Sequence, residues 1–134
     1  MSEAADPIRV GVIGTGAISQ VVHVPIFAER EDVDLVAVAD ADEHKAEALS
    51  RRFGVPEVLS AEETFAHPDL DAVVISTPNH LHEEMAVAAL EAGKHVFVEK
   101  PFTATSAQAE ALIELAERRR LQIMVDHTFL FNGA

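Results

Sequence analysis

The chain has 134 residues, of which 49% are hydrophobic and 25% charged, and this suits one globular domain with a buried core. Its formal net charge of −13 argues against nucleic acid and anionic membrane surfaces as partners, because like charges repel. The absence of cysteine excludes disulfides, thiolate metal sites and cysteine nucleophiles within the chain.

The first residues, Met1–Pro7, are acidic and polar, unlike a signal peptide. No apolar run approaches the length of a membrane span. We therefore expect a cytoplasmic protein.

A glycine-containing loop follows the first expected strand. Residues Ile8–Ile13 form a short apolar run rich in β-branched side chains, which predicts a buried strand, and a helical spacing begins near Ala17. In the loop between them, Gly14 allows a tight turn and Gly16 lets a ligand approach bare backbone. The helix N-terminus beyond it suits a pyrophosphate. Such a loop also occurs as an ordinary strand–helix turn, so its neighbours must decide between the two interpretations.

The second expected strand, Val33–Ala39, ends on Asp40, 21 residues after Ser19. A carboxylate there is what a dinucleotide-binding fingerprint uses to accept hydrogen bonds from the adenosine ribose hydroxyls. The competing interpretation, a cap for the next helix, fits Asp42 better. A ribose 2′-phosphate would meet a like charge at Asp40, at about 1 to 4 kcal/mol per pair, and no arginine follows to offset it. NAD is therefore predicted in preference to NADP.

Helices and strands alternate along the rest of the chain. Pro25 should kink or restart the first helix. Later helices are expected to begin at Asp42, Ser60, Asn79 and Thr105, whose side-chain oxygens can cap a helix N-terminus. Further strands are expected at residues 56–59, 71–77, 95–99 and 122–126.

The segment Thr77–His82 lies where the nicotinamide-side ribose and phosphates of a dinucleotide would pass. Its residue types alone favour a simple turn with two exposed histidines, His80 and His82. Because these are two positions apart on a helix they do not face each other, and no metal site is expected. The helix that follows should bury Leu81, Met85, Ala88, Ala89 and Ala92, and the last helix Ala109, Leu112, Ile113 and Ala116.

Near-continuous apolar strands separated by amphipathic helices indicate a parallel sheet covered on both faces. With the glycine loop after the first strand, we expect a single doubly wound α/β domain over residues 1–134, a Rossmann fold of six strands in the order 3-2-1-4-5-6. Ligands bind such sheets outside the carboxyl ends of the strands. The glycine loop, Asp40, Thr77–Asn79, Glu99–Pro101 and His127 all fall there.

Lys100 follows the fifth expected strand and precedes Pro101. A lysine in this place could hold a substrate hydroxyl, transfer a proton or be a surface charge. General physical arguments favour the surface, since lysine is usually exposed.

Several motifs together resemble the N-terminal half of the Gfo/Idh/MocA oxidoreductases, and Glu99-Lys100-Pro101 is the most specific of them. The others are Ile13–Ile18, Val38–Asp40, Ile75–His82, Ala92–Val98 and His127–Phe129. The resemblance implies that Lys100 is the catalytic lysine, beside the nicotinamide and the substrate hydroxyl. The cofactor-binding residues expected from the loop, from Asp40 and from the resemblance are Gly14, Thr15, Gly16, Ala17, Ile18, Asp40, Thr77, Pro78, Asn79, His82 and Glu99.

The resemblance also implies a second α/β domain, absent from this chain, that supplies the substrate pocket and a proton-transferring histidine, which His127 does not match. We therefore expect a truncated product, a fragment or an excised domain, and two functions stay open. The first is the cofactor-binding part of an oxidoreductase that moves hydride between NAD and a sugar, cyclitol or related polyol. The second is a stand-alone nucleotide-binding module without turnover. Without a covering domain, Phe129, Leu130 and Phe131 would favour self-association.

Overall fold

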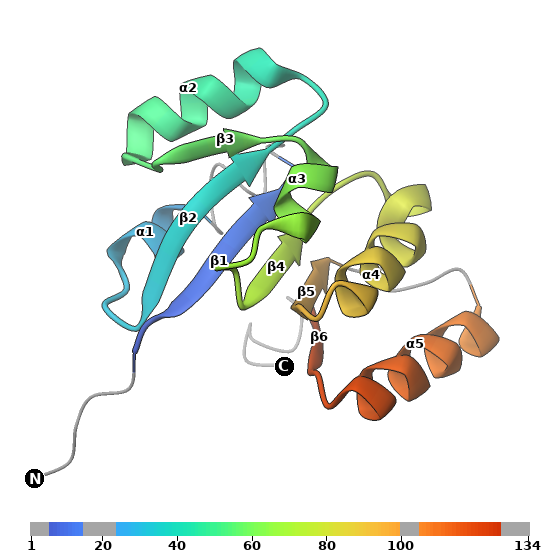
Figure 1. Ribbon diagram of the computed structural model, residues 1–134. Coiled ribbons are helices and arrows are strands. Elements are labelled where there is room, and N and C mark those ends of the chain that lie inside the picture. The colour runs from blue at the N-terminus through green and yellow to red at the C-terminus, as the bar shows by residue number, and fades with distance from the viewer. Residues whose placement is uncertain (1–5, 15–23, 100–104, 127–134) are drawn as a thin grey trace, which may run out of the picture.

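The computed structural model of the protein describes residues 6–14, 24–99 and 105–126. These residues contain a six-stranded sheet of order β3-β2-β1-β4-β5-β6, in which every neighbouring pair is parallel (Figure 1). The doubly wound α/β fold and the strand order predicted from the sequence are confirmed. The strands are β1 (Ile8–Ile13), β2 (Val33–Ala39), β3 (Glu57–Leu59), β4 (Ala72–Ile75), β5 (His95–Glu99) and β6 (Ile123–Asp126).

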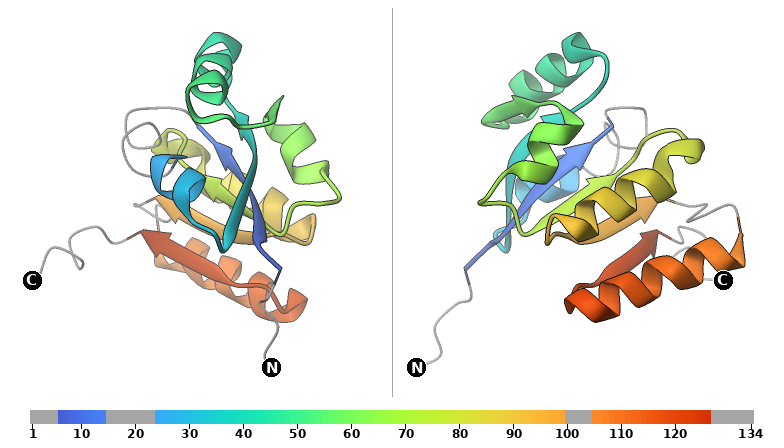
Figure 2. Two further views of the ribbon diagram at one scale, coloured as in Figure 1. Left: turned by 90° about the vertical axis from the view of Figure 1, so that its left-hand side faces the viewer. Right: turned by 45° about the vertical axis from the view of Figure 1, so that its right-hand side comes forward.

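Helices cover both faces of the sheet (Figure 2). On one face, Val10 and Val12 of β1 pack with α1 and α2 in one apolar core. On the other, Ile13 and Ile75 pack with α4 and α5 in a second core, which α3 also joins. The helical elements are α1 (Val24–Glu29), α2 (Glu43–Phe53), α3 (Ala61–Ala66), the 3₁₀ turn η2 (Asn79–Leu81), α4 (His82–Glu91) and α5 (Ser106–Arg119).

Three of the predicted helix starts are confirmed by their caps. The Asp42 side chain accepts a hydrogen bond from the backbone N–H of His44 at 3.1 Å, at the start of α2. Ser60 and Glu63 cap α3 reciprocally, and Thr105 caps α5 in the same way with Gln108. α1 begins at Val24 with Pro25 in its first turn, where the missing N–H of proline costs nothing. The predicted helical residues before Val24 lie outside the described part.

The start of α4 differs from the prediction. Asn79 belongs to the 3₁₀ turn, and α4 has Leu81 at its N-cap position with no side-chain hydrogen bond. Because a 3₁₀ turn has about 3.0 residues per turn, a helical phase counted from Asn79 is displaced. The predicted buried stripe is right for Ala89 and in part for Met85, which packs half-buried against the same core. The other residues that α4 buries are His82, Ala86 and Leu90, whereas Leu81 and Ala88 are half-buried and Ala92 is exposed.

Helix α5 buries Leu112 and Ala116, as predicted. Ile113, which was expected beside them, is 46% exposed. The main packing partner of α5 is α4, and β6 is the edge strand of the sheet. The apolar face of α5 is consequently narrower than its sequence indicates.

A buried lysine joins the loop before β4 to the start of β5. Lys94 is 6% exposed, and its Nζ donates hydrogen bonds to the carbonyl oxygens of His67, at 2.5 Å, and Leu70, at 2.8 Å. Burial lowers the pKa of the Lys94 amine, while the nearby carboxylates of Asp71 and Asp69 act in the opposite direction. The amine satisfies carbonyls that no strand pairs with, and so holds this end of the sheet together.

Candidate functional site

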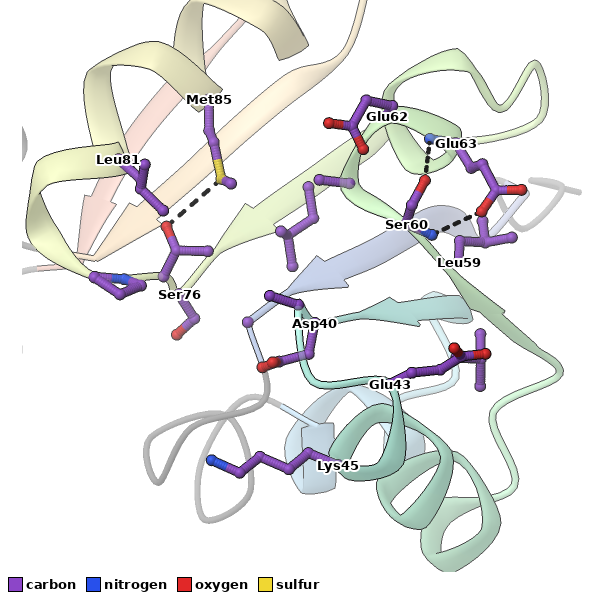
Figure 3. Close-up of a pocket in the computed structure, with 17 residues that line it drawn as sticks. Asp40, Glu43, Lys45, Leu59, Ser60, Glu62, Glu63, Ser76, Leu81 and Met85 are labelled. Carbon is purple, nitrogen blue, oxygen red and sulfur yellow. Dashed lines mark hydrogen bonds between the residues drawn. The ribbon is translucent and has the colours of Figure 1, made fainter.

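A cavity of about 950 Å³ lies at the carboxyl edge of the sheet (Figure 3). Its size lies within the range of roughly 300 to 1,000 Å³ typical of small-molecule pockets. The walls come from the ends of β1 to β4 and from the first turns of α2, α3 and α4. The lining residues are Ile13, Gly14, Asp40, Ala41, Glu43, Lys45, Val58, Leu59, Ser60, Ala61, Glu62, Glu63, Ser76, Thr77, Pro78, Leu81 and Met85.

Gly14 follows β1 and lies against the ends of β2 and β4, in the lining of this cavity. Its backbone N–H donates to the carbonyl of Ala39 at 2.7 Å, and its φ of +100° is a conformation that side chains rarely allow. A Cβ at this position would lie 2.4 Å from the carbonyl oxygen of Ser76. The backbone of the β4 end, rather than a ligand, therefore requires glycine here. The Gly14 N–H is also already paired with the Ala39 carbonyl, so it does not offer a ligand a free donor.

Asp42 makes the helix cap that the sequence assigned to it, and Asp40 is left to line the cavity at the end of β2. The Asp40 Oδ1 accepts a hydrogen bond from the backbone N–H of Asp42 at 2.7 Å. This local turn fixes the orientation of the Asp40 carboxylate before any ligand arrives.

A buried histidine holds the turn after β4 in place through a hydrogen bond. The Nε2 of His82 donates to the carbonyl oxygen of Thr77 at 2.8 Å, and His82 is only 1% exposed. The interpretation with two exposed histidines is therefore wrong for His82 and holds only for His80. Thr77 and Pro78 line the cavity, and the Thr77 hydroxyl donates to the sulfur of Met85 at 3.6 Å. His82 is absent from the described lining and acts on the site through the Thr77 carbonyl.

Sequence reasoning missed several residues of the cavity wall. The Oγ of Ser76 is buried and has no hydrogen-bond partner in the part of the chain that the structure describes. Its place directly after β4 was the available signal, because carboxyl ends of parallel strands meet at one edge. The same rule applied to β3 would have found Ser60 and Glu62, whose labelled side chains stand on the wall opposite Leu81 (Figure 3).

Part of the predicted site lies outside the described residues. These residues are Thr15, Gly16, Ala17, Ile18, Lys100, Pro101 and His127, while Asn79 and Glu99 are described by their backbone only.

Among residues 6–14, 24–99 and 105–126, no group of three or more His, Cys, Asp or Glu side chains is arranged to hold a metal ion. No helix among them has both the length and the apolar character needed to cross a membrane.

The whole sequence also matches a family model, which agrees with the strand order and with the motifs at the carboxyl edge. Residues 8–127 match the Gfo/Idh/MocA family model, described as an oxidoreductase family with an NAD-binding Rossmann fold. The chain belongs to the Gfo/Idh/MocA oxidoreductase family. The resemblance found in the motifs is thereby confirmed.

Individual Gfo/Idh/MocA relatives are longer than this chain. It is 36% identical over 127 residues to dTDP-3,4-didehydro-2,6-dideoxy-alpha-D-glucose 3-reductase of Saccharopolyspora spinosa, covering 95% of the chain and 38% of that relative. It is 35% identical over 117 residues to D-glucoside 3-dehydrogenase of Escherichia coli (strain K12), covering 85% of the chain and 33% of that relative. The chain thus spans well under half the length of the curated relatives that it matches.

Solved structures of Gfo/Idh/MocA proteins share the fold described above. KijD10, a 3-ketoreductase from Actinomadura kijaniata in complex with NADP and TDP-benzene, matches with a TM-score of 0.89 at 37% identity. The match covers 93% of this chain and 38% of that one. The cofactor in that complex is NADP, so the comparison supports NAD(P) binding in the family without supporting NAD over NADP.

Proposed function

We propose that this chain binds NAD(P) in the carboxyl-edge cavity and forms the cofactor half of an oxidoreductase that acts on a sugar, cyclitol or related polyol. The observation that carries the proposal is the cavity itself, which combines a fixed carboxylate, Asp40, with the glycine turn at Gly14. A Rossmann sheet binds dinucleotides at this edge, where the strand order reverses between β1 and β4.

The described residues suit the parts of a dinucleotide. Asp40 would accept hydrogen bonds from the adenosine ribose hydroxyls, since its carboxylate is held at the cavity wall. The buried hydroxyl of Ser76 would gain the partner that it lacks among the described residues. The apolar side chains of Ile13, Leu81 and Met85 would cover flat ring surface. The Thr77-Pro78 turn, held by His82, would pass along the phosphates.

Hydride transfer in such a complex oxidises a carbinol carbon to a carbonyl. The C–H bond breaks with its electron pair, which reduces the nicotinamide ring of the cofactor, and the hydroxyl proton leaves to a base. In this proposal Lys100 holds and polarises the substrate oxygen, and reduction of a ketone runs through the same steps in reverse. The substrate pocket and a further proton-transferring group would come from outside this chain.

The first test is calorimetric titration of the chain with NAD and with NADP, followed by a screen of sugars and cyclitols for NAD(P)H formation at 340 nm. Binding of a dinucleotide without turnover is the expected result for the isolated chain. Binding by the chain combined with a substrate domain, again without turnover on any polyol, would favour the stand-alone module instead. No binding of either dinucleotide would refute the proposal.

We propose further that Asp40 favours NAD. Asp40→Ala should weaken NAD binding about 10- to 150-fold, because hydrogen bonds to a charged group contribute about 1.5 to 3 kcal/mol. NADP binding should weaken less or improve, since a like charge beside the 2′-phosphate disappears. Asp34→Ala is the matched control, because Asp34 is exposed on β2 and does not line the cavity. An unchanged ratio of the two affinities would remove Asp40 from the ribose site.

Lys100→Met tests the chemical step in a protein that carries this chain together with a substrate domain. Turnover should fall at least about 100-fold, the lower end for positioned acid–base groups. Affinity for the dinucleotide should stay within about twofold, because the proposed contact of Lys100 is with substrate. Steady-state kinetics and calorimetry measure the two quantities separately. Intact turnover with lost cofactor binding would contradict the assigned role.

A further inference from the structure

A methionine sulfur lies in the wall of the carboxyl-edge cavity. Met85, near the start of α4, is half-buried and extends toward the end of β4 (Figure 3). Its Sδ accepts a hydrogen bond from the Thr77 hydroxyl at 3.6 Å. Ile13 and Leu81 are apolar residues of the same lining. The sulfur therefore contacts the turn after β4 on one side and is open to the cavity on the other.

Met85 is the readily oxidised residue of this lining. Among the described residues that line the cavity there is no cysteine, histidine or aromatic side chain. Hydrogen peroxide, which is little larger than water, can enter a cavity of about 950 Å³. The sulfur attacks one peroxide oxygen, the O–O bond breaks, and the departing hydroxide takes the proton from the transferred oxygen to give water. The thioether is thereby oxidised by two electrons to a sulfoxide, and the peroxide is reduced.

The Thr77 hydroxyl determines which sulfoxide forms. A thioether sulfur has two lone pairs, and the Thr77 hydroxyl occupies one of them. An oxidant that approaches through the cavity meets the other lone pair. Because the sulfur of a sulfoxide is chiral, the reaction should give mostly one of the two epimers. The position of Thr77 is itself fixed, since His82 donates to its carbonyl oxygen at 2.8 Å.

We propose that Met85 is an oxidation switch of the carboxyl-edge cavity: a hydroperoxide converts it to the sulfoxide, which weakens dinucleotide binding, and a bound dinucleotide shields the sulfur. The inference rests on the proposed function, because it presupposes that the dinucleotide lies against Met85. A methionine sulfoxide reductase with its thiol reductant restores the thioether, and with it the binding.

The sulfoxide weakens binding for two physical reasons. Oxidation places a polar S=O group in an apolar surface that covers a flat ring, and a polar group that is covered without a hydrogen-bond partner destabilises the complex. Oxidation also withdraws electron density from the sulfur, so the Thr77 hydroxyl loses its acceptor or turns toward the new oxygen. Either outcome changes the wall that the ligand contacts.

Peroxide treatment of the folded chain, followed by peptide mapping with mass spectrometry and by calorimetric titration with NAD and NADP, tests the switch. Conversion of Met85 to the sulfoxide should weaken binding about 5- to 150-fold, the range for a polar group buried without a partner. With NAD or NADP at about ten times its dissociation constant, oxidation of Met85 should slow about tenfold, because about a tenth of the chains are then free. Treatment with the reductase should return the affinity.

Met124 is the matched control, because it is 61% exposed on β6 and does not line the cavity. Its oxidation should give both epimers, which two stereospecific reductases distinguish, and should proceed at the same rate with and without dinucleotide. In Met124→Leu, peroxide should still weaken binding. In Met85→Leu, peroxide should leave binding at that variant's own untreated value. Thr77→Val, which has nearly the same shape and no hydroxyl, should lose the preference for one epimer at Met85.

The possible results separate the switch from the proposed function. A loss of affinity that follows Met85 oxidation, is absent in Met85→Leu and is reversed by the reductase supports the switch. An oxidised Met85 with unchanged affinity, the same loss in Met85→Leu, no slowing by the ligand, unfolding of the oxidised chain by circular dichroism, or a Met85 that stays reduced while Met124 is fully oxidised overturns it and leaves dinucleotide binding standing. An equal mixture of epimers at Met85 refutes the role of Thr77. A folded, untreated chain that binds neither dinucleotide overturns the proposed function itself.

Discussion

Gly14→Ala should lower the free energy of unfolding by about 2 to 6 kcal/mol and abolish dinucleotide binding. The φ of +100° costs a residue with a side chain about 1 to 3 kcal/mol. The added Cβ would also lie 2.4 Å from the carbonyl oxygen of Ser76 and 3.0 Å from the backbone nitrogen of Thr77. These atoms follow β4 and cannot move without breaking the pairing of β4 with β1, which adds a cost of about 1 to 3 kcal/mol for overpacking.

Gly54→Ala provides the control for the Gly14 substitution. Gly54 has a φ of +69° at the end of α2, and a Cβ there would meet no atom within 4 Å. Its replacement should therefore cost only the conformational part, about 1 to 2 kcal/mol. Urea unfolding of both variants measures the two costs, and their difference isolates the contact with the β4 end. Equal losses in the two variants would mean that this contact is relaxed in solution.

Lys94→Met should lower the free energy of unfolding by about 1.5 to 4.5 kcal/mol. Methionine has a similar length and is apolar, so it fills the space but donates no hydrogen bond. The Leu70 carbonyl would lose the donor that Lys94 supplies, and a buried acceptor left without a partner costs about 1 to 3 kcal/mol. The His67 carbonyl would keep the N–H of Leu70 at 3.4 Å, so it loses only one hydrogen bond, about 0.5 to 1.5 kcal/mol. Chemical denaturation measures the loss. A loss below about 0.5 kcal/mol would show that water replaces the amine.

Lys45→Met is the matched control, since this lysine is exposed and should change stability by no more than about 0.5 kcal/mol. The pH adds a second readout. Because burial lowers the pKa of Lys94 below its ordinary 10.5, the unfolded chain binds more protons between the two values. The stability of the wild type relative to Lys94→Met should therefore rise as the pH rises through the folded pKa toward 10.5. A relative fall in that range would contradict the direction of the shift.

Most of the fold could be predicted because its signals are local. The apolar runs identify the strands, and the capping residues Asp42, Ser60 and Thr105 place three helix starts correctly. The alternation of strands and helices then allows few arrangements, since crossovers between parallel strands are right-handed. Where a local signal was ambiguous, as at Asn79, a 3₁₀ turn replaced the expected cap and displaced the buried face of α4.

The candidate site was predicted less completely. Asp40, Thr77 and Pro78 line the cavity, and each follows a recognisable strand. Lys45 was missed because nothing in its immediate sequence marks it, and Ser76 because the expected strand ran on to residue 77, whereas β4 ends at Ile75. Both residues matter because other segments of the chain complete the cavity that they line. The same holds for the residues of α3 that line it.

The sequence by itself determined the strands, their order and the edge at which a ligand would bind, because apolar periodicity, caps and the handedness of crossovers are properties of short segments. Only the tertiary structure decided which side chains share the cavity: it brought the end of β4 against Gly14, placed α3 opposite α4, and put Lys45 and Asp40 in the lining of one cavity. The physical reason is that these relations depend on the packing of segments far apart in the chain, where a shift of part of a helical turn changes which groups face one another.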